Sequence, residues 1–276
     1  MVMKRVGSVI CYRRVMHSFN RRANRVAVAM SGGIDSSVSA AILKDQGLNV
    51  VGVFMKNWDA GDEVGGNLGV CSSARDYEDA QDVCKRLQIP LIEAEFIKDY
   101  WNNVFMPFVD EYQNGLSTPN PDVQCNRYIK FKRFKEFVKT TLEIDTIATG
   151  HYVQTLLDTN SGELTGSLKL LRGKDESKDQ SYFLAMTPGT CLQNVLFPVG
   201  AMLKSEVRVL AEQRFRGLRV LSKRESMGLC FIGKRRSFVE FINEYISLTP
   251  GNFVDMDSLG HLIQYRPTTR SEIIPF

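Results

Sequence analysis

The sequence lacks the features that mark several common classes of protein. No Cys-x-x-Cys pair occurs among the six cysteines, which stand at positions 11, 71, 84, 125, 191 and 230. This scatter argues against a disulfide framework and against a zinc site, and it favours a reducing compartment. No apolar run approaches the roughly 20 residues of a membrane-spanning helix, so we expect no membrane partner. The net charge of +4 is compatible with nucleic-acid binding without establishing it.

Acidic residues are missing before Asp35, whereas residues 1–30 hold seven lysines and arginines. Apolar residues are interleaved with the basic ones, but there is no apolar core of a secretory signal. This composition is typical of a mitochondrial transit peptide. We therefore predict a leader over residues 1–24 and a mitochondrial protein. The alternative is a plain basic tail on a cytoplasmic protein.

The chain also lacks the Gly-Lys-[Ser/Thr] ending of a Walker loop, yet one stretch has the chemistry of a phosphate site. The apolar run Val26–Met30 leads into Ser31-Gly32-Gly33-Ile34-Asp35-Ser36, and a helix is predicted from there to about Gly47. Backbone N–H groups at such a helix N-terminus can bind phosphate oxygens, because the glycines leave no Cβ in the way. A carboxylate beside phosphates is repelled unless a cation lies between them, so we predict Asp35 to be a Mg²⁺ ligand.

The string from Ser31 to Ser36 resembles the pyrophosphate loop of the ATP pyrophosphatase, or PP-loop, superfamily. Members of that superfamily adenylate a carbonyl oxygen and release pyrophosphate. Strand-like runs at 49–55, 91–96 and 146–148 alternate with helical patterns. That alternation predicts an α/β fold with a doubly wound, Rossmann-like parallel sheet.

The pattern changes along the chain and predicts three parts after the leader. We expect a PP-loop ATP-binding catalytic domain over residues 25–190. A small, incomplete central domain of short helices and turns is predicted over 191–257, and a divergent tail over 258–276.

Three local expectations bear on the site. A capping-box pattern opens a helix at Ser73, and its apolar face includes Cys84, which we predict to be a core residue. Two prolines predict a stiff loop over Leu116–Asp122, followed by a helix over Val123–Thr141. A hairpin is predicted over Tyr152–Arg172.

Two cysteines have contexts that favour chemistry. Cys125 comes shortly after Asn120-Pro121-Asp122, near the start of a helix rich in lysine and arginine. Cys230 lies between glycines and close to Lys234 and Arg235. A helix N-terminus and nearby cations both favour the thiolate, which is the nucleophilic form. Taken alone, each cysteine is more often a buried spectator.

Four motifs follow the Ser31–Ser36 loop in a fixed order. They are Asn120-Pro121-Asp122-x-x-Cys125-Asn126, Thr149-Gly150-His151-Tyr152, Lys178-Asp179-Gln180-Ser181-Tyr182-Phe183-Leu184 and Glu225-Ser226-Met227-Gly228-x-Cys230-Phe231-Ile232-Gly233. Together they closely resemble tRNA-specific 2-thiouridylase, in its mitochondrial form given the leader. The resemblance runs from about Arg25 to Asp255.

The resemblance implies a reaction and a set of site residues. The C2 oxygen of the wobble uridine in tRNAs for Lys, Glu and Gln would be adenylated with ATP and replaced by sulfur. ATP would bind at Ala29, Met30, Ser31, Gly32, Gly33, Asp35 and Ser36, with Met55 and Gly150 beside the adenine. The flipped base would be held by Asn120, Pro121 and Asp122, and the tRNA would be contacted by Lys178, Asp179 and Gln180.

The same resemblance assigns the sulfur chemistry to the two cysteines. Cys230 would accept a persulfide from a sulfur-donor protein. Either the persulfide or hydrosulfide freed from it would attack C2, while Cys125 closes a disulfide with Cys230. His151 is expected to be a hydrogen-bonded residue at a strand end and not a catalytic group.

The resemblance ends at about Asp257, where we expect the C-terminal β-barrel of the family to be absent. Two other functions therefore stay open on the sequence alone. One is another PP-loop synthetase, such as an amidating enzyme with ammonia as the nucleophile, which needs no pair of cysteines. The other is a truncated, non-catalytic RNA-binding product.

Overall fold

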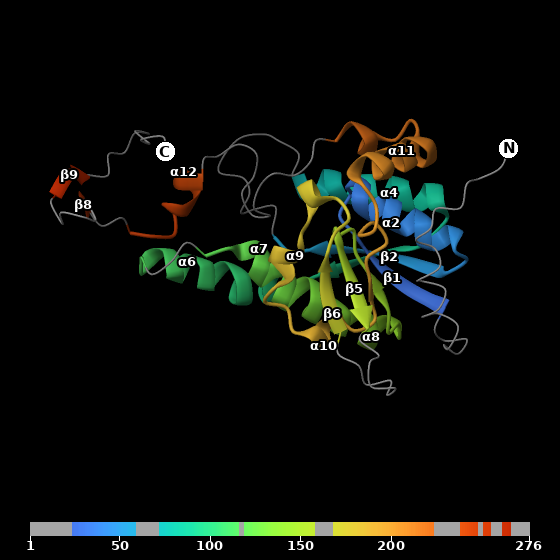
Figure 1. Ribbon diagram of the computed structural model, residues 1–276, viewed down its shortest axis with the longest axis horizontal. Coiled ribbons are helices and arrows are strands. Elements are labelled where there is room, and N and C mark those ends of the chain that lie inside the picture. The colour runs from blue at the N-terminus through green and yellow to red at the C-terminus, as the bar shows by residue number, and fades with distance from the viewer. Residues whose placement is uncertain are drawn as a thin grey trace.

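A five-stranded parallel sheet forms the centre of the molecule (Figure 1). The computed structural model describes residues 24–58, 72–115, 119–157, 168–223, 238–247, 251–254 and 261–265. The strand order is β3-β2-β1-β4-β7, and every neighbouring pair runs parallel. The strands are β1 (Arg25–Met30), β2 (Asn49–Lys56), β3 (Leu91–Glu95), β4 (Ile147–Ala148) and β7 (Val195–Leu196).

This order confirms the predicted doubly wound α/β fold. The chain moves outward from β1 to β3 and then returns to place β4 on the other side of β1. Crossover loops leave in opposite directions at the carboxyl ends of β1 and β4, which opens a crevice there for a ligand. The Ser31–Ser36 loop follows β1 directly and so lies at this switch point.

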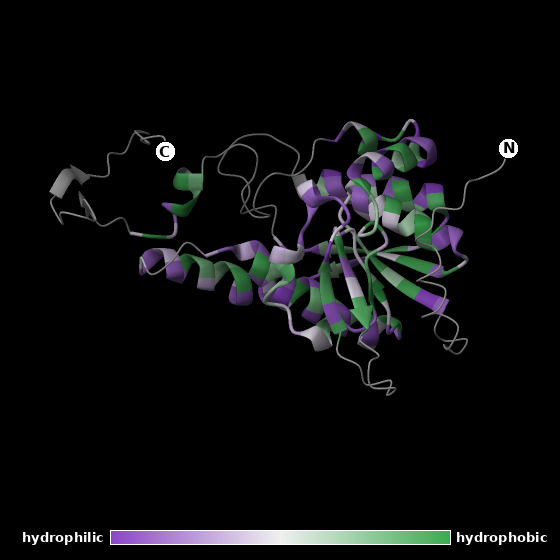
Figure 2. Ribbon diagram, in the orientation of Figure 1, coloured by the Kyte–Doolittle hydropathy of each residue, from purple (hydrophilic) through white to green (hydrophobic). Residues whose placement is uncertain are grey.

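The sheet is buried on both faces. Five of the six residues in β1 are buried, as expected for a central parallel strand with a continuous apolar run. One core lies between the sheet and the helices α2 (Ile34–Asp45), α4 (Ser72–Leu87) and α11 (Lys204–Phe215), which Figure 1 shows together on one side. Figure 2 shows mainly hydrophobic strands covered by helices of mixed hydropathy.

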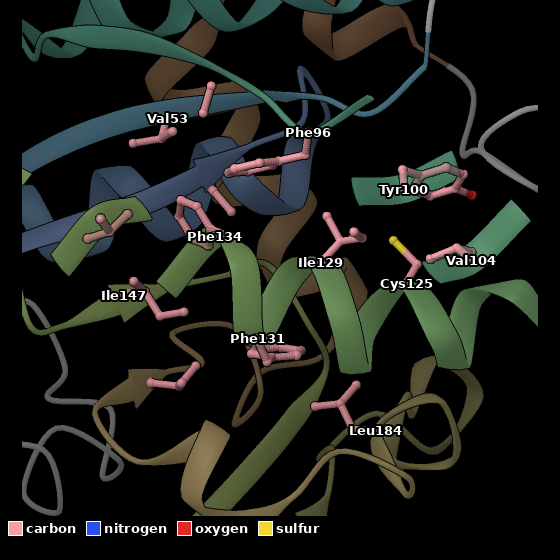
Figure 3. Packing of buried hydrophobic residues seen from close by; sticks show 14 of the residues in the cluster. Val53, Phe96, Tyr100, Val104, Cys125, Ile129, Phe131, Phe134, Ile147 and Leu184 are labelled. Carbon is pink, nitrogen blue, oxygen red and sulfur yellow. The ribbon is translucent and has the colours of Figure 1, made fainter. Parts of the chain in front are cut away.

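The second core fills the opposite face. It is covered by the π-helical segments η2 (Trp101–Phe105) and η3 (Cys125–Arg133) and by α8 (Phe134–Leu142). Figure 3 labels Phe131 and Phe134 of this layer and Val53 and Ile147 of the strands, all members of this core. All four side chains are fully buried.

Shorter elements connect and extend these layers. They are α5 (Ile97–Tyr100), α6 (Met106–Gln113), α7 (Pro121–Gln124), β5 (Val153–Leu157), β6 (Leu168–Arg172), η4 (Glu176–Lys178), α9 (Ser181–Leu184), α10 (Gly189–Leu192), η5 (Arg219–Ser222), α12 (Phe238–Ile242), β8 (Gly251–Val254) and β9 (His261–Tyr265). Strands β5 and β6 pair antiparallel, which confirms the predicted hairpin, although its turn lies outside the described residues. No helix in the described part of the chain is long and apolar enough to cross a membrane.

Cys84 is a core residue, as predicted. Its side chain is 2% exposed on α4, against the sheet. Burial raises the pKa of the Cys84 thiol to about 12. The thiol is therefore protonated and unreactive at neutral pH.

The helix predicted to begin at Val123 begins two residues earlier, at Pro121. A proline is well tolerated in the first turn of a helix, because the N–H that it lacks has no intrahelical partner there. The Asn120 side chain caps this start by accepting a hydrogen bond from the Asp122 N–H at 3.0 Å. Pro121 therefore starts the helix instead of extending the loop, and α7, η3 and α8 continue without a break to Leu142.

The sheet domain also extends beyond the boundary predicted at residue 190. Strand β7 completes the sheet through its pairing with β4, and α11 packs in the same core as α2. A two-residue strand carries too little pattern to be recognised in the sequence. The 12-residue helix α11 was missed because only short helices were expected after residue 191.

Candidate nucleotide site at the switch point

The loop after β1 is shaped by glycines and held by its own hydroxyl groups. Gly32 has φ +68°, a left-handed conformation that glycine adopts at little cost. The Ser36 hydroxyl donates to the Gly33 carbonyl at 3.0 Å and accepts from the Ser31 N–H at 3.2 Å. The Ser37 hydroxyl also donates to the Gly33 carbonyl, at 2.8 Å. These bonds fix the loop in one conformation.

The N-terminus of α2 is built to receive an anion. Gly33 is its N-cap, and no side chain caps the helix there. The first N–H groups of a helix have no intrahelical acceptor and carry the positive end of the helix dipole. An uncapped N-terminus of a 12-residue helix, beside two serine hydroxyls, fits the phosphate groups of a nucleotide.

Two glycines allow other segments to approach this loop closely. A Cβ on Gly150 would lie 2.7 Å from the Ser36 nitrogen, and one on Gly32 would lie 2.2 Å from the Asp76 carbonyl oxygen. The backbone after β4 and the first turn of α4 thus pack directly on the loop. Gly150, which the resemblance places beside the adenine, lies against this loop.

The remaining residues predicted to bind ATP are less open. Ala29 and Met30 are 8% and 1% exposed, and their side chains belong to the two cores. Only the backbone of these two residues is therefore left to contact a nucleotide. Met55 is half-buried near the end of β2.

Asp35 makes an ion pair that the sequence did not reveal. The Lys204 Nζ donates to both Asp35 carboxylate oxygens, at 2.7 and 2.8 Å, and the Tyr152 hydroxyl donates to one of them at 2.7 Å. The Lys204 ammonium also lies 5.5 Å from the centroid of the Tyr152 ring. Asp35 is therefore held by two side chains from distant parts of the chain.

This pairing disagrees with the prediction of Asp35 as a Mg²⁺ ligand. Both carboxylate oxygens already accept from an ammonium group, and a divalent cation would have to displace it. Within the described residues, no group of three or more His, Cys, Asp or Glu side chains could hold a metal ion. The residues around Asp35 do not fit a preformed magnesium site.

A second lysine touches the loop from the segment after η5. The Lys223 Nζ donates to the Gly32 carbonyl at 3.0 Å and to the Asp76 carboxylate. Arg219 donates to the nearby Asp79 carboxylate at 2.7 Å. Neither Lys204 nor Lys223 was predicted, because both are more than 150 residues from the loop and belong to none of the motifs in the sequence.

Cys125 lies inside the core, at the junction of α7 and η3. Its side chain is 1% exposed, and Figure 3 shows it near Val104 and Ile129. The neighbouring Asn126 amide donates to the Phe183 carbonyl at 3.2 Å, which ties η3 to α9. Cys230, the other predicted sulfur carrier, lies outside the described residues.

The segment predicted to hold the base forms the start of α7, with Asp122 in its first turn. Asn120 caps the helix and Pro121 is buried. Burial raises the pKa of the Asp122 carboxyl, and the charge of Lys130 opposes this only in part. Asp122 therefore takes up a proton more readily than an ordinary aspartate.

Hydrogen bonds of Asp179 and Gln180 hold the loop that is predicted to contact tRNA. The Asp179 carboxylate accepts from the Gly173 N–H at 2.8 Å and from the Ser181 hydroxyl at 2.7 Å. The Gln180 side chain accepts from the Tyr152 N–H at 3.0 Å. Lys178 is half-buried at the end of η4. These bonds connect the loop that carries Lys178 to Tyr152, and through it to Asp35.

His151 is a hydrogen-bonded residue beside the strand end, as predicted. Its Nδ1 lies 2.8 Å from the Thr149 hydroxyl, and its ring contacts those of Phe131 and Phe197. Burial, aided by the charge of Lys130, holds the pKa of His151 well below its usual value. The imidazole is thus neutral at pH 7.

A parallel sheet in this order, with an uncapped glycine loop at its switch point, defines a PP-loop nucleotide-binding domain. The family model described as tRNA methyl transferase HUP domain matches residues 24–234, and the chain belongs to this family. The chain is 47% identical over 240 residues to the tRNA-specific 2-thiouridylase MnmA of Oceanobacillus iheyensis. It is also 47% identical, over 233 residues, to the protein of the same name in Ligilactobacillus salivarius.

These matches cover 87% and 84% of this chain but only 61% and 58% of the two relatives. The predicted resemblance to 2-thiouridylases of the PP-loop superfamily is thereby confirmed at the level of the family. Among solved structures, the chain is similar to NMN synthetase from Francisella tularensis, with 15% identity and a TM-score of 0.47 over 84% of this chain and 82% of that one.

The close approach at Gly150 predicts the effect of adding one methyl group. Gly150→Ala should weaken ATP binding at least about tenfold and lower the free energy of unfolding by about 1–3 kcal/mol, because the backbone of Ser36 must move. Gly189→Ala is the control, since its added Cβ meets nothing within 4 Å. Titration calorimetry with ATP and chemical denaturation measure both effects. Equal ATP affinity in the two variants would contradict this account of the loop.

The raised pKa of Asp122 predicts a pH-dependent stability. A carboxyl whose folded pKa is raised contributes stability below its unfolded pKa, and that contribution is lost as pH rises through the folded pKa. Asp122→Asn removes this loss, so it should raise the melting temperature at pH 7 but not near the ordinary carboxyl value of 3.8. Asp110→Asn, at an exposed position on α6, is the control. Thermal unfolding across this range tests it; a variant that is less stable than the wild type at pH 7 would refute the assignment.

Proposed function

We propose that this chain is the catalytic part of a tRNA-uridine 2-sulfurtransferase. Its substrate would be the wobble uridine of tRNAs for Lys, Glu and Gln, whose C2 oxygen is replaced by sulfur. The observation that carries the proposal is the 47% identity to relatives named tRNA-specific 2-thiouridylase, over a stretch that contains both the anion-binding loop and Cys125. Because the chain spans 58–61% of these relatives, the activity of the whole protein is part of the proposal.

ATP, when bound, supplies the adenylyl group that turns the uridine C2 oxygen into a good leaving group. The N–H groups at the start of α2, with the Ser31 and Ser36 hydroxyls, would hold its phosphates. Met55 and Gly150 would flank the adenine. Mg²⁺ would enter with the phosphates, since Asp35 is already engaged by Lys204.

The helix start at Asn120–Asp122 would hold the extracted base. Removing a base from its stack costs a few kcal/mol, so the pocket must supply compensating contacts. Asp122 suits this position, because its raised pKa lets the carboxyl exchange a proton with a uracil ring more readily than an ordinary aspartate. Lys178 and the basic side chains of η3 would contact the tRNA backbone.

The two cysteines would deliver the sulfur. A sulfur-donor protein would place a persulfide on Cys230. In one route, the Cys125 thiolate attacks the Cys230 sulfur, a Cys125–Cys230 disulfide forms, and hydrosulfide leaves to attack C2. In the other, the persulfide attacks C2 itself and Cys125 then releases the product by closing the same disulfide. An external thiol must reduce that disulfide before the next cycle.

The described residues on either side of the Cys230 stretch support this arrangement. Before it, Lys223 is bonded to the Gly32 carbonyl of the loop. After it, Phe238 of α12 packs edge-on against Phe108 of α6, with ring centroids 6.1 Å apart. The last described residue before the stretch is thus bonded to the loop, and the first one after it packs on α6, the helix that follows η2.

A thiolation assay tests the proposed function. Purified protein, unmodified lysine tRNA, ATP and a persulfide donor should give 2-thiouridine, detected by mass spectrometry of the nucleosides. Cys125→Ser and Cys230→Ser should each lower the rate at least about a hundredfold, because each removes one sulfur of the transfer pair. Cys84→Ser is the matched control and should stay within about twofold of the wild type, since Cys84 is a buried core residue.

Two outcomes would contradict the proposal. Full turnover of Cys125→Ser with ammonia as the nucleophile would indicate an amidating synthetase. Absence of any ATP–pyrophosphate exchange in the presence of tRNA would indicate a non-catalytic RNA-binding protein.

We further propose that residues 1–24, of which only Asn24 lies in the described part of the chain, direct the protein to mitochondria. A reporter fused to residues 1–30 should enter mitochondria, and glutamate at positions 13, 14, 21 and 22 should stop it by removing the positive charge. Lysine at the same four positions keeps the charge and should preserve import. Cytosolic location of the unaltered fusion would mean that the stretch is a basic tail.

A further inference from the structure

The Asp35–Lys204 pair places opposite charges inside the phosphate site. Asp35 is the second residue of α2, so its carboxylate lies at the helix end that would receive the phosphates. Lys204 is the first residue of α11, which packs in the same core as α2. Its side chain is only 12% exposed and that of Asp35 32%, so the pair is partly removed from solvent. Charges in such a place interact more strongly than they do in water.

The surrounding contacts fix Lys204 in this position. Its backbone N–H donates to the Asp175 carboxylate at 2.8 Å, and the Glu206 carboxylate caps the helix by accepting from the Leu203 N–H at 2.7 Å. Further along α11, Val207 and Ala211 are fully buried in the core that α2 shares. The position of Lys204 beside Asp35 is thus fixed by a helix that packs in the core.

The Tyr152 side chain completes the arrangement. Its hydroxyl donates to the same Asp35 oxygen that Lys204 approaches most closely, and its ring lies beside the ammonium. Both groups therefore bind the same carboxylate oxygen of Asp35. An aspartate that would otherwise repel phosphate is neutralised before a nucleotide arrives.

We propose that Lys204 is a positioning residue of the ATP site: it cancels the charge of Asp35 and holds that carboxylate back, so that the phosphates meet a neutral loop. The inference rests on the proposed function, because it takes ATP as the ligand. It replaces the expected Mg²⁺ at Asp35 with a cation that belongs to the protein.

A set of charge variants tests this role through ATP affinity in EDTA, without Mg²⁺. Lys204→Met leaves an unpaired carboxylate at the helix N-terminus and should weaken ATP binding at least about tenfold. Asp35→Asn leaves an uncompensated ammonium and should tighten it at least about threefold. The double variant restores neutrality and should return to within about threefold of the wild type. The expected order of affinity is therefore Asp35→Asn, then wild type and double variant, then Lys204→Met.

Lys174→Met is the matched control. Lys174 forms an ion pair with Glu206 of α11, and the two side chains are 45% and 42% exposed. Its loss should leave ATP affinity within about twofold of the wild type, because exposed ion pairs contribute little. Melting temperatures of all variants, measured in parallel, separate lost folding from lost affinity.

The outcomes discriminate between roles. If the double variant binds ATP as weakly as Lys204→Met, the lysine acts on the phosphates directly or only supports the fold, and the inference is overturned. If Lys204→Met does not fold, the double and Asp35→Asn variants decide the matter, since weakening in either by about tenfold or more would overturn it. If the wild type does not bind ATP even with Mg²⁺, the proposed function fails and the inference with it. Unchanged affinity in Lys204→Met would overturn the inference alone.

Discussion

Backbone-to-backbone contact at the N-terminus of α2 is the constraint on which the site depends. The segment after β4 approaches so closely that a single Cβ at Gly150 would collide with the Ser36 nitrogen, and α4 does the same at Gly32. Close approach of this kind is possible only because the parallel strand order brings the carboxyl ends of β1 and β4 together. The fold therefore creates the crevice, and the glycines allow it to close around the loop.

The Asp35 carboxylate and the Gly32 carbonyl of the loop have cationic partners from a distant part of the chain. The segment from Lys204 to Lys223 supplies two lysines, one on the Asp35 carboxylate and one on the Gly32 carbonyl. Both are contributed by residues beyond the boundary first expected for the sheet domain. The last strand of the sheet and these two lysines thus come from the same part of the chain. That part therefore packs on the sheet and its loop and does not form a separate domain.

The sequence allowed the central sheet and the loop to be predicted because both depend on local signals. The apolar run of β1 and the Ser31–Ser36 string are each contained in a stretch of about ten residues, so they can be recognised without knowing the rest of the fold. The Lys204–Asp35 pair could not be predicted, since it joins residues 169 apart and either partner alone is an ordinary surface charge. The start of α7 was placed wrongly for a different reason: proline was taken as a breaker where it serves as the first residue of a helix.

Cys125 is a buried cysteine at the start of a π-helical segment. The thiol is 1% exposed at the first residue of η3, a nine-residue π-helical segment, and a second π-helical segment, η2, contributes the neighbouring Val104. Wider π-helical turns are less favourable than α-helical ones and are found mostly where function requires them. Here they allow a cysteine just past a proline-started, capped helix to enter the apolar layer beneath the sheet instead of facing water. A nucleophile stored in this way is protected from oxidation and from unproductive partners. In the proposed function, sulfur transfer by Cys125 therefore requires the side chains that cover its thiol to separate.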